Sequence, residues 1–104
     1  NDYKPNSGIE WAQRAVLLDP ESAAANDVYG FSLWYQGRMA EARSVLNYAL
    51  QLDSNLASAH YHLGLVLADQ GEFSIARAAY EQALALDPEG YIGNLAINAL
   101  ARLP

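Results

Sequence analysis

The feature that most constrains the fold of this chain is an internal repeat of 34 residues. Residues 15–20 (AVLLDP), 49–54 (ALQLDS) and 83–88 (ALALDP) recur at that interval. Aligning 23–56 with 57–90 gives twelve identities in 34 positions, whereas the composition alone would give about three or four. A period of this length predicts a stack of similar units that bury a continuous core between neighbours.

Each repeat unit is predicted to contain two helices. Leu63, Val66 and Leu67 follow helical spacing, and Gly71, which can adopt a positive φ, ends that helix. A proline after Asp87 ends the next one, because the residue before proline disfavours the helical region. No segment alternates like a strand, so the sequence predicts six helices over roughly 7–18, 22–36, 39–52, 56–70, 73–86 and 90–103.

Small residues at fixed repeat positions indicate close contact between paired helices. Gly30 and Gly64 lie mid-helix, where glycine costs about 0.5–1 kcal/mol relative to alanine. That cost at two equivalent positions predicts a helix packed directly against them. The partner helix repeats alanines seven residues apart, and larger side chains fill the space between. These are Ala42, Ala49, Ala76 and Ala83, with Leu46 and Tyr80.

Composition and charge narrow the classes of function. The 104 residues suffice for one modest domain. Twelve acidic against six basic residues give a net charge of −6, which argues against nucleic acid or an anionic membrane surface as partner. The chain has no cysteine and no apolar run long enough for a membrane span. We expect a soluble chain and favour the cytoplasm, although the sequence does not identify a compartment. The first residues match the second half of a unit, so we expect a piece of a longer protein.

The sequence contains no motif typical of catalysis or metal binding. His60 and His62 stand two residues apart, so they point to different sides of a helix, unlike the i, i+4 pair of a helical metal site. No glycine-rich phosphate loop or calcium loop is present. Asp19, Asp53 and Asp87 recur at the junctions between units, which favours a role in turns. We therefore expect no enzymatic activity, no cofactor and no metal.

The sizes of the side chains and their spacing along each unit resemble those of the tetratricopeptide repeat. The second unit carries the pattern at Leu63, Gly64, Gly71, Phe73, Ala76, Tyr80, Ala83 and Pro88. The first unit departs from it at Met39, Leu46 and Ser54, and Asn98 departs from it near the end. The resemblance implies an all-α, right-handed solenoid of antiparallel helix pairs. Its parts would be a half repeat over 7–20, repeats over 23–56 and 57–90, and the first helix of a further repeat, or a cap, over 91–104.

The same resemblance implies a concave face lined by the first helix of each repeat. The partner-binding residues carried over in this way are Asp27, Phe31, Trp34, Tyr35, Tyr61, His62, Leu65, Asp69, Ile92 and Leu95. An exposed aromatic cluster would mark a contact site, while internal packing is the alternative reading. With Asp27 and Asp69 as an acidic rim, we expect an apolar peptide, an amphipathic helix or a basic–apolar segment as ligand. The basic groups of a carboxylate clamp are missing.

Two further functions remain open from the sequence. The predicted last helix is apolar nearly all round, and the first helix lacks a partner for Trp11 and Leu17, whereas a terminal helix usually has a polar outer face. Self-association through the groove or the end helices is therefore one alternative to a free binding groove. The other is that this segment recruits substrates for an enzyme whose catalytic domain lies outside it.

Overall fold

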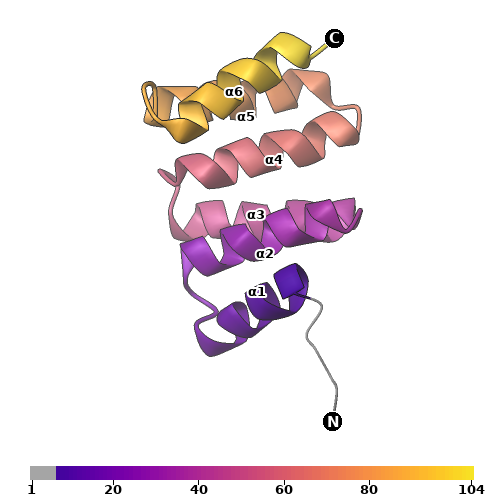
Figure 1. The fold of residues 1–104 in the computed structure, drawn as a ribbon, viewed down its shortest axis with the longest axis vertical. Coiled ribbons are helices and arrows are strands. Elements are labelled where there is room, and N and C mark those ends of the chain that lie inside the picture. The colour runs from indigo at the N-terminus through magenta and orange to yellow at the C-terminus, as the bar shows by residue number, and fades with distance from the viewer. Residues whose placement is uncertain (1–6) are drawn as a thin grey trace.

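A computed structural model of the chain describes residues 7–104, and the first six residues of the predicted 1–104 segment lie outside the described residues. Six helices follow one another and stack into an elongated body of 47 × 24 × 22 Å (Figure 1). They are α1 (Ser7–Leu18), α2 (Ala23–Tyr35), α3 (Met39–Leu52), α4 (Ala57–Asp69), α5 (Phe73–Leu86) and α6 (Tyr91–Arg102). Residues 7–104 contain no strand. The predicted all-α helical repeat is confirmed, and every helix end lies within one residue of its predicted position.

Glycines with positive φ close the two central hairpins. Gly37 and Gly71 have φ values of +80° and +79°, which cost glycine little because it has no Cβ. After α4, the Gly71 N–H donates to the Ala68 carbonyl (3.0 Å) and the Glu72 N–H to the Leu67 carbonyl (2.9 Å). This pair of bonds satisfies carbonyls that the helix end leaves free. The same pair follows α2, so two equivalent turns fold each pair of helices back antiparallel.

Within each hairpin, the mid-helix glycine lies directly against a side chain of the partner helix, as predicted. A Cβ placed on Gly30 would lie 2.5 Å from Cγ of Leu46, and one placed on Gly64 would fall against the ring of Tyr80. Real Cβ atoms do not come so close to a neighbour. Each glycine therefore leaves room for a large side chain of the partner helix to pack against its backbone. The small residues of the partner helices are fully buried, as predicted: Ala42, Ala49, Ala76 and Ala83.

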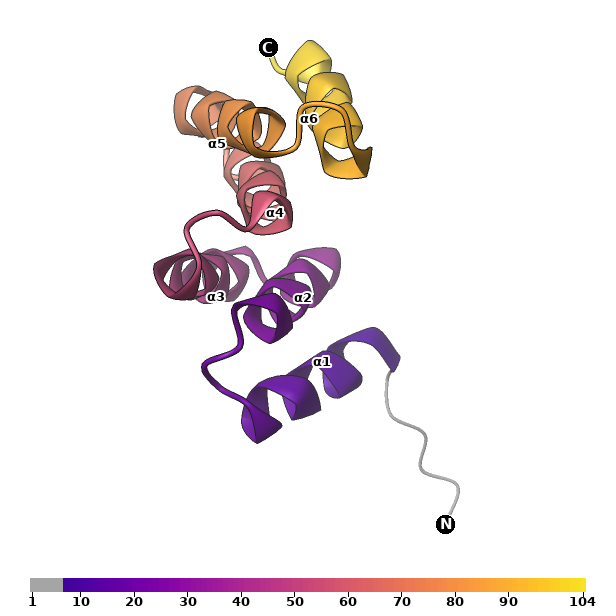
Figure 2. The same cartoon turned by 90° about the vertical axis from the view of Figure 1, so that its left-hand side faces the viewer.

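The helices form two sides of the stack. α4 contacts both α2 and α6, and these three helices form one face, called here the α2–α4–α6 face. α3 and α5 lie on the opposite side and do not contact each other, because α4 lies between them (Figure 2). The packing therefore leaves two long surfaces, one on each side of α4.

The aspartates at the junctions act in turns, as predicted. The Asp53 carboxylate accepts a hydrogen bond from the Asn55 N–H at 3.0 Å. Asp87 Oδ2 accepts from the N–H groups of Ile92 (3.1 Å) and Gly93 (3.4 Å), so it caps the start of α6. At Asp19 the turn uses the backbone carbonyl, which accepts from the N–H of Ser22 at 3.1 Å.

Large apolar side chains are exposed at both ends of the stack. On α1 the exposed fractions are 57% for Trp11, 77% for Leu17 and 87% for Leu18. On α6 they are 75% for Tyr91 and 48% for Ile97. In the part of the chain that the structure describes, no helix is both long and apolar enough to cross a membrane.

Candidate functional site

A row of neighbouring rings runs along the α2–α4–α6 face from α2 to α4 and ends at the buried Tyr80 of α5. The Phe31 ring lies 5.5 Å from that of Trp34 and 4.4 Å from the imidazole of His62, both in stacked orientation. Tyr61 continues the row, with centroid distances of 5.7 Å to His62 and 5.9 Å to Tyr80. These separations are within the range of favourable aromatic pairs. The five residues are called here the aromatic row.

Asp27 lies under the aromatic row as the centre of a polar network between α2 and α4. The residue is 4% exposed, so its carboxylate needs partners that compensate for lost hydration. Ser58 Oγ donates to its Oδ2 at 2.5 Å, and His62 Nδ1 lies 2.6 Å from its Oδ1. The short contact between Nδ1 and Oδ1 joins His62 of α4 to Asp27 of α2. The network fixes the orientation of the imidazole beneath Phe31.

The order of groups in this network differs from that of a catalytic triad. In a triad the histidine lies between the hydroxyl and the carboxylate, and removes the proton of the nucleophile. Here Asp27 lies between Ser58 and His62. The Ser58 hydroxyl therefore donates to a carboxylate, and its role is to join helices. Among residues 7–104, no group of three or more His, Cys, Asp or Glu side chains is placed to hold a metal ion.

Asp69 is the last residue of α4 and is hydrogen-bonded to one member of the aromatic row. Its Oδ2 accepts a hydrogen bond from the indole Nε1 of Trp34 at 2.6 Å, which bridges α2 and α4. Unlike Asp27, Asp69 is exposed. Its carboxylate therefore lies at the surface, beside the aromatic rings.

The aromatic row opens into a cavity of about 240 Å³ beside α6. Tyr61, Leu65 and Leu95 line it, together with the rings of Phe73 and Tyr80 and the exposed Arg102. Burial raises the pKa of Tyr80 to about 12, with smaller contributions from Tyr61 and Asp69. Burial also raises the pKa of Tyr61, although the positive charge of Arg102 opposes that shift. Both phenols are therefore neutral at physiological pH and present apolar rings to the cavity.

The structure places most of the sequence-predicted residues in one continuous surface. Phe31, Trp34, Tyr61 and His62 are half-buried rather than fully exposed, so they pack together while keeping one side accessible. Tyr35 stands apart at the end of α2, with 78% of its surface exposed. Ile92 and Leu95 are both half-buried on α6. Ile92 packs against the core around Tyr80, whereas Leu95 lines the cavity.

Asp27 was predicted to form part of an acidic rim, but it is buried. The prediction required an exposed carboxylate, but the Asp27 side chain is 5% exposed and shared by Ser58 and His62. The reason is that α4 packs against this part of α2 and brings both partners to it. Of the two predicted acidic residues, Asp69 alone faces solvent.

Three residues of the site were missed by sequence reasoning. The sequence analysis did not identify Ser58 as a partner of Asp27, and it assigned Tyr80 only to the contacts between helices. Arg102 was not included among the predicted binding residues. A usable signal was the repeat itself, since the positions of Asp27 and Ser58 belong to the first helices of neighbouring units, which lie side by side.

Comparisons with known proteins identify the repeat. Residues 57–89 match a family model described as "Tetratricopeptide repeat", and residues 30–71 match another described as "TPR repeat". Together the two models span more than half of the chain. No curated protein sequence matches significantly.

Solved structures of tetratricopeptide domains share the fold. The TPR domain of Arabidopsis OM64 has a TM-score of 0.77 at 17% identity, covering 88% of this chain and 76% of that domain. The second TPR domain of human RPAP3, solved in complex with an HSP70 peptide, has a TM-score of 0.76 at 21% identity, with coverage of 90% and 76%.

A third similar structure is a thermophilic TPR protein from Thermus thermophilus, with a TM-score of 0.77 at 28% identity. The match covers 92% of this chain and 53% of that protein, so this chain spans about half of its length. The 34-residue period, the stacked antiparallel hairpins and the two family models lead to one conclusion. The chain belongs to the tetratricopeptide repeat family.

Proposed function

We propose that this chain is a non-catalytic protein–protein interaction module that binds a peptide or helix of its partner across the α2–α4–α6 face. In this proposal the repeats over 23–56 and 57–90 form the centre of the module, between the half repeats over 7–20 and 91–104. The observation that carries the proposal is the aromatic row, which runs across this face and into the 240 Å³ cavity.

The aromatic row suits recognition of an apolar segment. Tryptophan and tyrosine are enriched among the residues that contribute most to binding. The Asp27 network and the indole bond to Asp69 hold the rings in place before a ligand arrives. A preformed surface loses less conformational entropy on binding. The cavity beside Leu95 has room for one side chain of the ligand.

Charge at the two ends of the row would select the ligand further. Asp69 favours a basic residue next to the apolar anchor, and Arg102 favours an acidic one at the α6 end. The family's carboxylate clamp needs basic and amide groups on this face, whereas this chain has Asp27, Phe31 and His62 at three of those positions. We therefore propose an apolar anchor with a basic neighbour as the principal ligand feature. The RPAP3 domain was solved with a bound peptide, which supports peptide binding by a domain of this fold. It does not support the preference for an apolar anchor with a basic neighbour.

A peptide-display selection on the whole chain tests the proposal. Peptides enriched by the wild type are synthesised, and their affinities are measured by calorimetry against the Trp34→Ala/Tyr61→Ala double variant. We expect the affinity to fall about tenfold or more, because two aromatic contacts are lost. Circular dichroism of the variant must retain the helical signal of the wild type. Unchanged affinity in a folded variant would refute the proposed site.

A matched control separates this face from the rest of the surface. Ala78 is an exposed residue of α5. The substitution Ala78→Ser introduces the residue found 34 positions earlier, at Ser44. It should leave peptide affinity unchanged. A loss in this control equal to that in the double variant would indicate binding elsewhere.

Two alternatives follow from the same chain. Exposed apolar residues at both ends, led by Leu18 at 87%, favour a homo-oligomerisation module. The second alternative is the recruiting arm of an enzyme whose catalytic domain lies outside this sequence. In that case, the selected peptides would resemble a segment of the enzyme's substrate.

A further inference from the structure

The hydrogen bond between Trp34 and Asp69 is not part of the repeat pattern. At these two positions the neighbouring units have neither an indole nor a carboxylate. Ala68 and Arg102 stand at the position of Trp34, and Tyr35 and Leu103 stand at that of Asp69. The stacking of the units therefore does not require this pair of residues.

The bond places a carboxylate at the edge of an aromatic ring. Asp69 Oδ2 lies 2.6 Å from the indole Nε1 of Trp34, and the N–H of an indole lies in the plane of its ring. The carboxylate therefore sits beside the ring and not over it. Phe31 stacks against the indole with centroids 5.5 Å apart, and Trp34 as a whole is still half-buried. A ligand group at this place would meet an aromatic ring and a carboxylate together.

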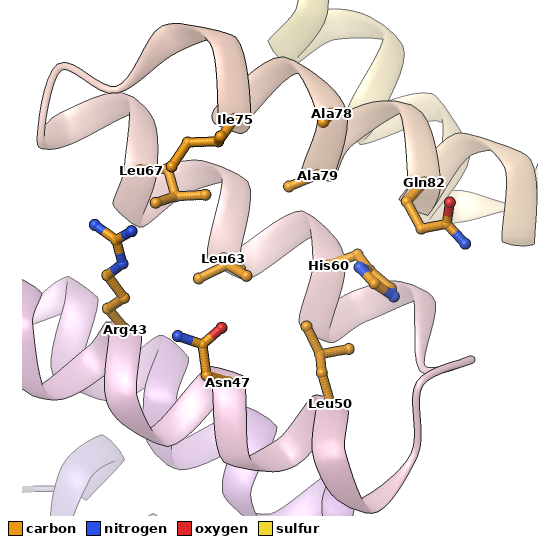
Figure 3. Close-up of a pocket in the computed structure, with 10 residues that line it drawn as sticks. All are labelled: Arg43, Asn47, Leu50, His60, Leu63, Leu67, Ile75, Ala78, Ala79 and Gln82. Atoms are coloured by element: carbon orange, nitrogen blue, oxygen red, sulfur yellow. The ribbon is translucent and has the colours of Figure 1, made fainter.

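Among residues 7–104, no basic side chain forms an ion pair with Asp69. Arg43 bonds to Gln70, the next residue, but its ion pair is with Glu72. Arg43 belongs instead to the lining of a groove of about 460 Å³ between α3 and α5, which has α4 as its floor and is called here the α3–α5 groove (Figure 3). The donor to Asp69 is a neutral indole, so the acidic residue keeps its charge available for a basic group from outside.

A ring beside a carboxylate fits the guanidinium group of arginine better than it fits the ammonium group of lysine. The guanidinium is planar, so it can lie against an indole while its N–H groups donate to a carboxylate. The ammonium is a compact and strongly hydrated charge, and it gains less from a ring at an exposed site. The Asp69 carboxylate has acceptor sites left after the indole bond, because a carboxylate has about four.

We propose that Trp34 and Asp69 form a subsite for one arginine side chain of the partner, next to the apolar segment on the aromatic row. The guanidinium lies against the indole and donates to the Asp69 carboxylate. The net charge of −6 favours the approach of a basic segment, while the exposed Arg102 beside the cavity disfavours an arginine at the α6 end. The inference rests on the proposed function and specifies its basic ligand group.

A double-mutant cycle between the chain and its ligand tests the subsite. The probes are peptides that the whole chain enriches in the display selection and that lose affinity in Tyr61→Ala, a variant that leaves Trp34 and Asp69 unchanged. We expect these peptides to share one arginine. Replacing it by glutamine should lower the affinity for the wild type about fivefold. The same replacement should change the affinity for Asp69→Asn very little, because the charged partner is already lost.

The choice of variant separates recognition of a ligand from a structural role. Asp69→Asn keeps an oxygen that can accept the indole N–H, so a carboxylate that only joined α2 to α4 could be replaced without loss of affinity. Glu81→Gln removes one negative charge from an exposed position of α5 and should bind the peptides like the wild type. Circular dichroism and the midpoint of thermal unfolding verify that each variant is folded.

A lysine peptide distinguishes arginine recognition from attraction by charge alone. Replacing the shared arginine by lysine should lower the affinity for the wild type about threefold, because the contact with the indole is weakened. Equal affinity of the two peptides would overturn the arginine subsite.

The remaining outcomes separate this inference from the proposed function. Peptides that depend on Tyr61 but share no arginine would overturn the subsite and leave the proposed function intact. Equal losses against the wild type and Asp69→Asn, when arginine is replaced by glutamine, would do the same. A selection that enriches no peptide, or only peptides that bind Tyr61→Ala as well as the wild type, would overturn the proposed function and the subsite with it.

Discussion

His62 Nδ1 lies 2.6 Å from Asp27 Oδ1, which joins α4 to α2 beneath the ring of Phe31. The carboxylate is almost inaccessible to water, and its second oxygen accepts the hydroxyl of Ser58. One buried acidic residue thus connects two neighbouring first helices and fixes an aromatic surface above it.

Replacing Asp27 by alanine should destabilise the fold by about 2–4 kcal/mol, because it leaves Ser58 and His62 without their partner. Chemical denaturation measures the free energy of unfolding. Asp27→Asn, which keeps an oxygen acceptor at the same site, is the control and should cost less. Equal costs for the two substitutions would contradict the role assigned to the charged network.

Gly64→Ala should destabilise the fold by about 1–3 kcal/mol, because its Cβ would fall against the ring of Tyr80 within a well-packed core. Alanine otherwise favours a helix over glycine, so the sign of the effect distinguishes close packing from helix propensity. Ala78→Ser, on the exposed side of α5, should change the midpoint of thermal unfolding very little. A stabilising effect of Gly64→Ala would show that Tyr80 has room to move.

Asp87→Ala should weaken the start of α6 by about 1 kcal/mol, the usual value of a helix cap. Its carboxylate accepts from the backbone of Ile92 and Gly93. Amide hydrogen exchange should quicken at these two residues, while α2 remains protected. Uniform loss of protection along the chain would point to global destabilisation instead.

High pH should destabilise the fold through Tyr80. Its pKa is about 12 in the folded chain, against an ordinary value of 10.0. Between these values the unfolded chain releases the phenolic proton and the folded chain retains it, so the stability contributed below pH 10 is lost as the pH rises toward 12. The free energy of unfolding, measured by denaturant titration across this window, should fall less steeply in Tyr80→Phe. Identical slopes would contradict this assignment.

The sequence by itself determined the helices and their pairing. The 34-residue period and its local signals placed six helices to within one residue at each end, because glycine, proline and apolar spacing act locally. Gly30 and Gly64 also identified the helix contacts in advance, since a mid-helix glycine at a repeated position is explained by a neighbour that needs the space.

The tertiary structure decided which polar groups are buried and which surfaces stay open. Asp27 and Asp69 are both acidic residues on first helices, yet Asp27 is enclosed by Ser58 and His62, while Asp69 faces solvent at the end of α4. The α3–α5 groove likewise depends on side chains from three helices. Burial is a property of neighbours brought together across the stack, so the pattern within one repeat could place each residue on a face but could not determine what covers it.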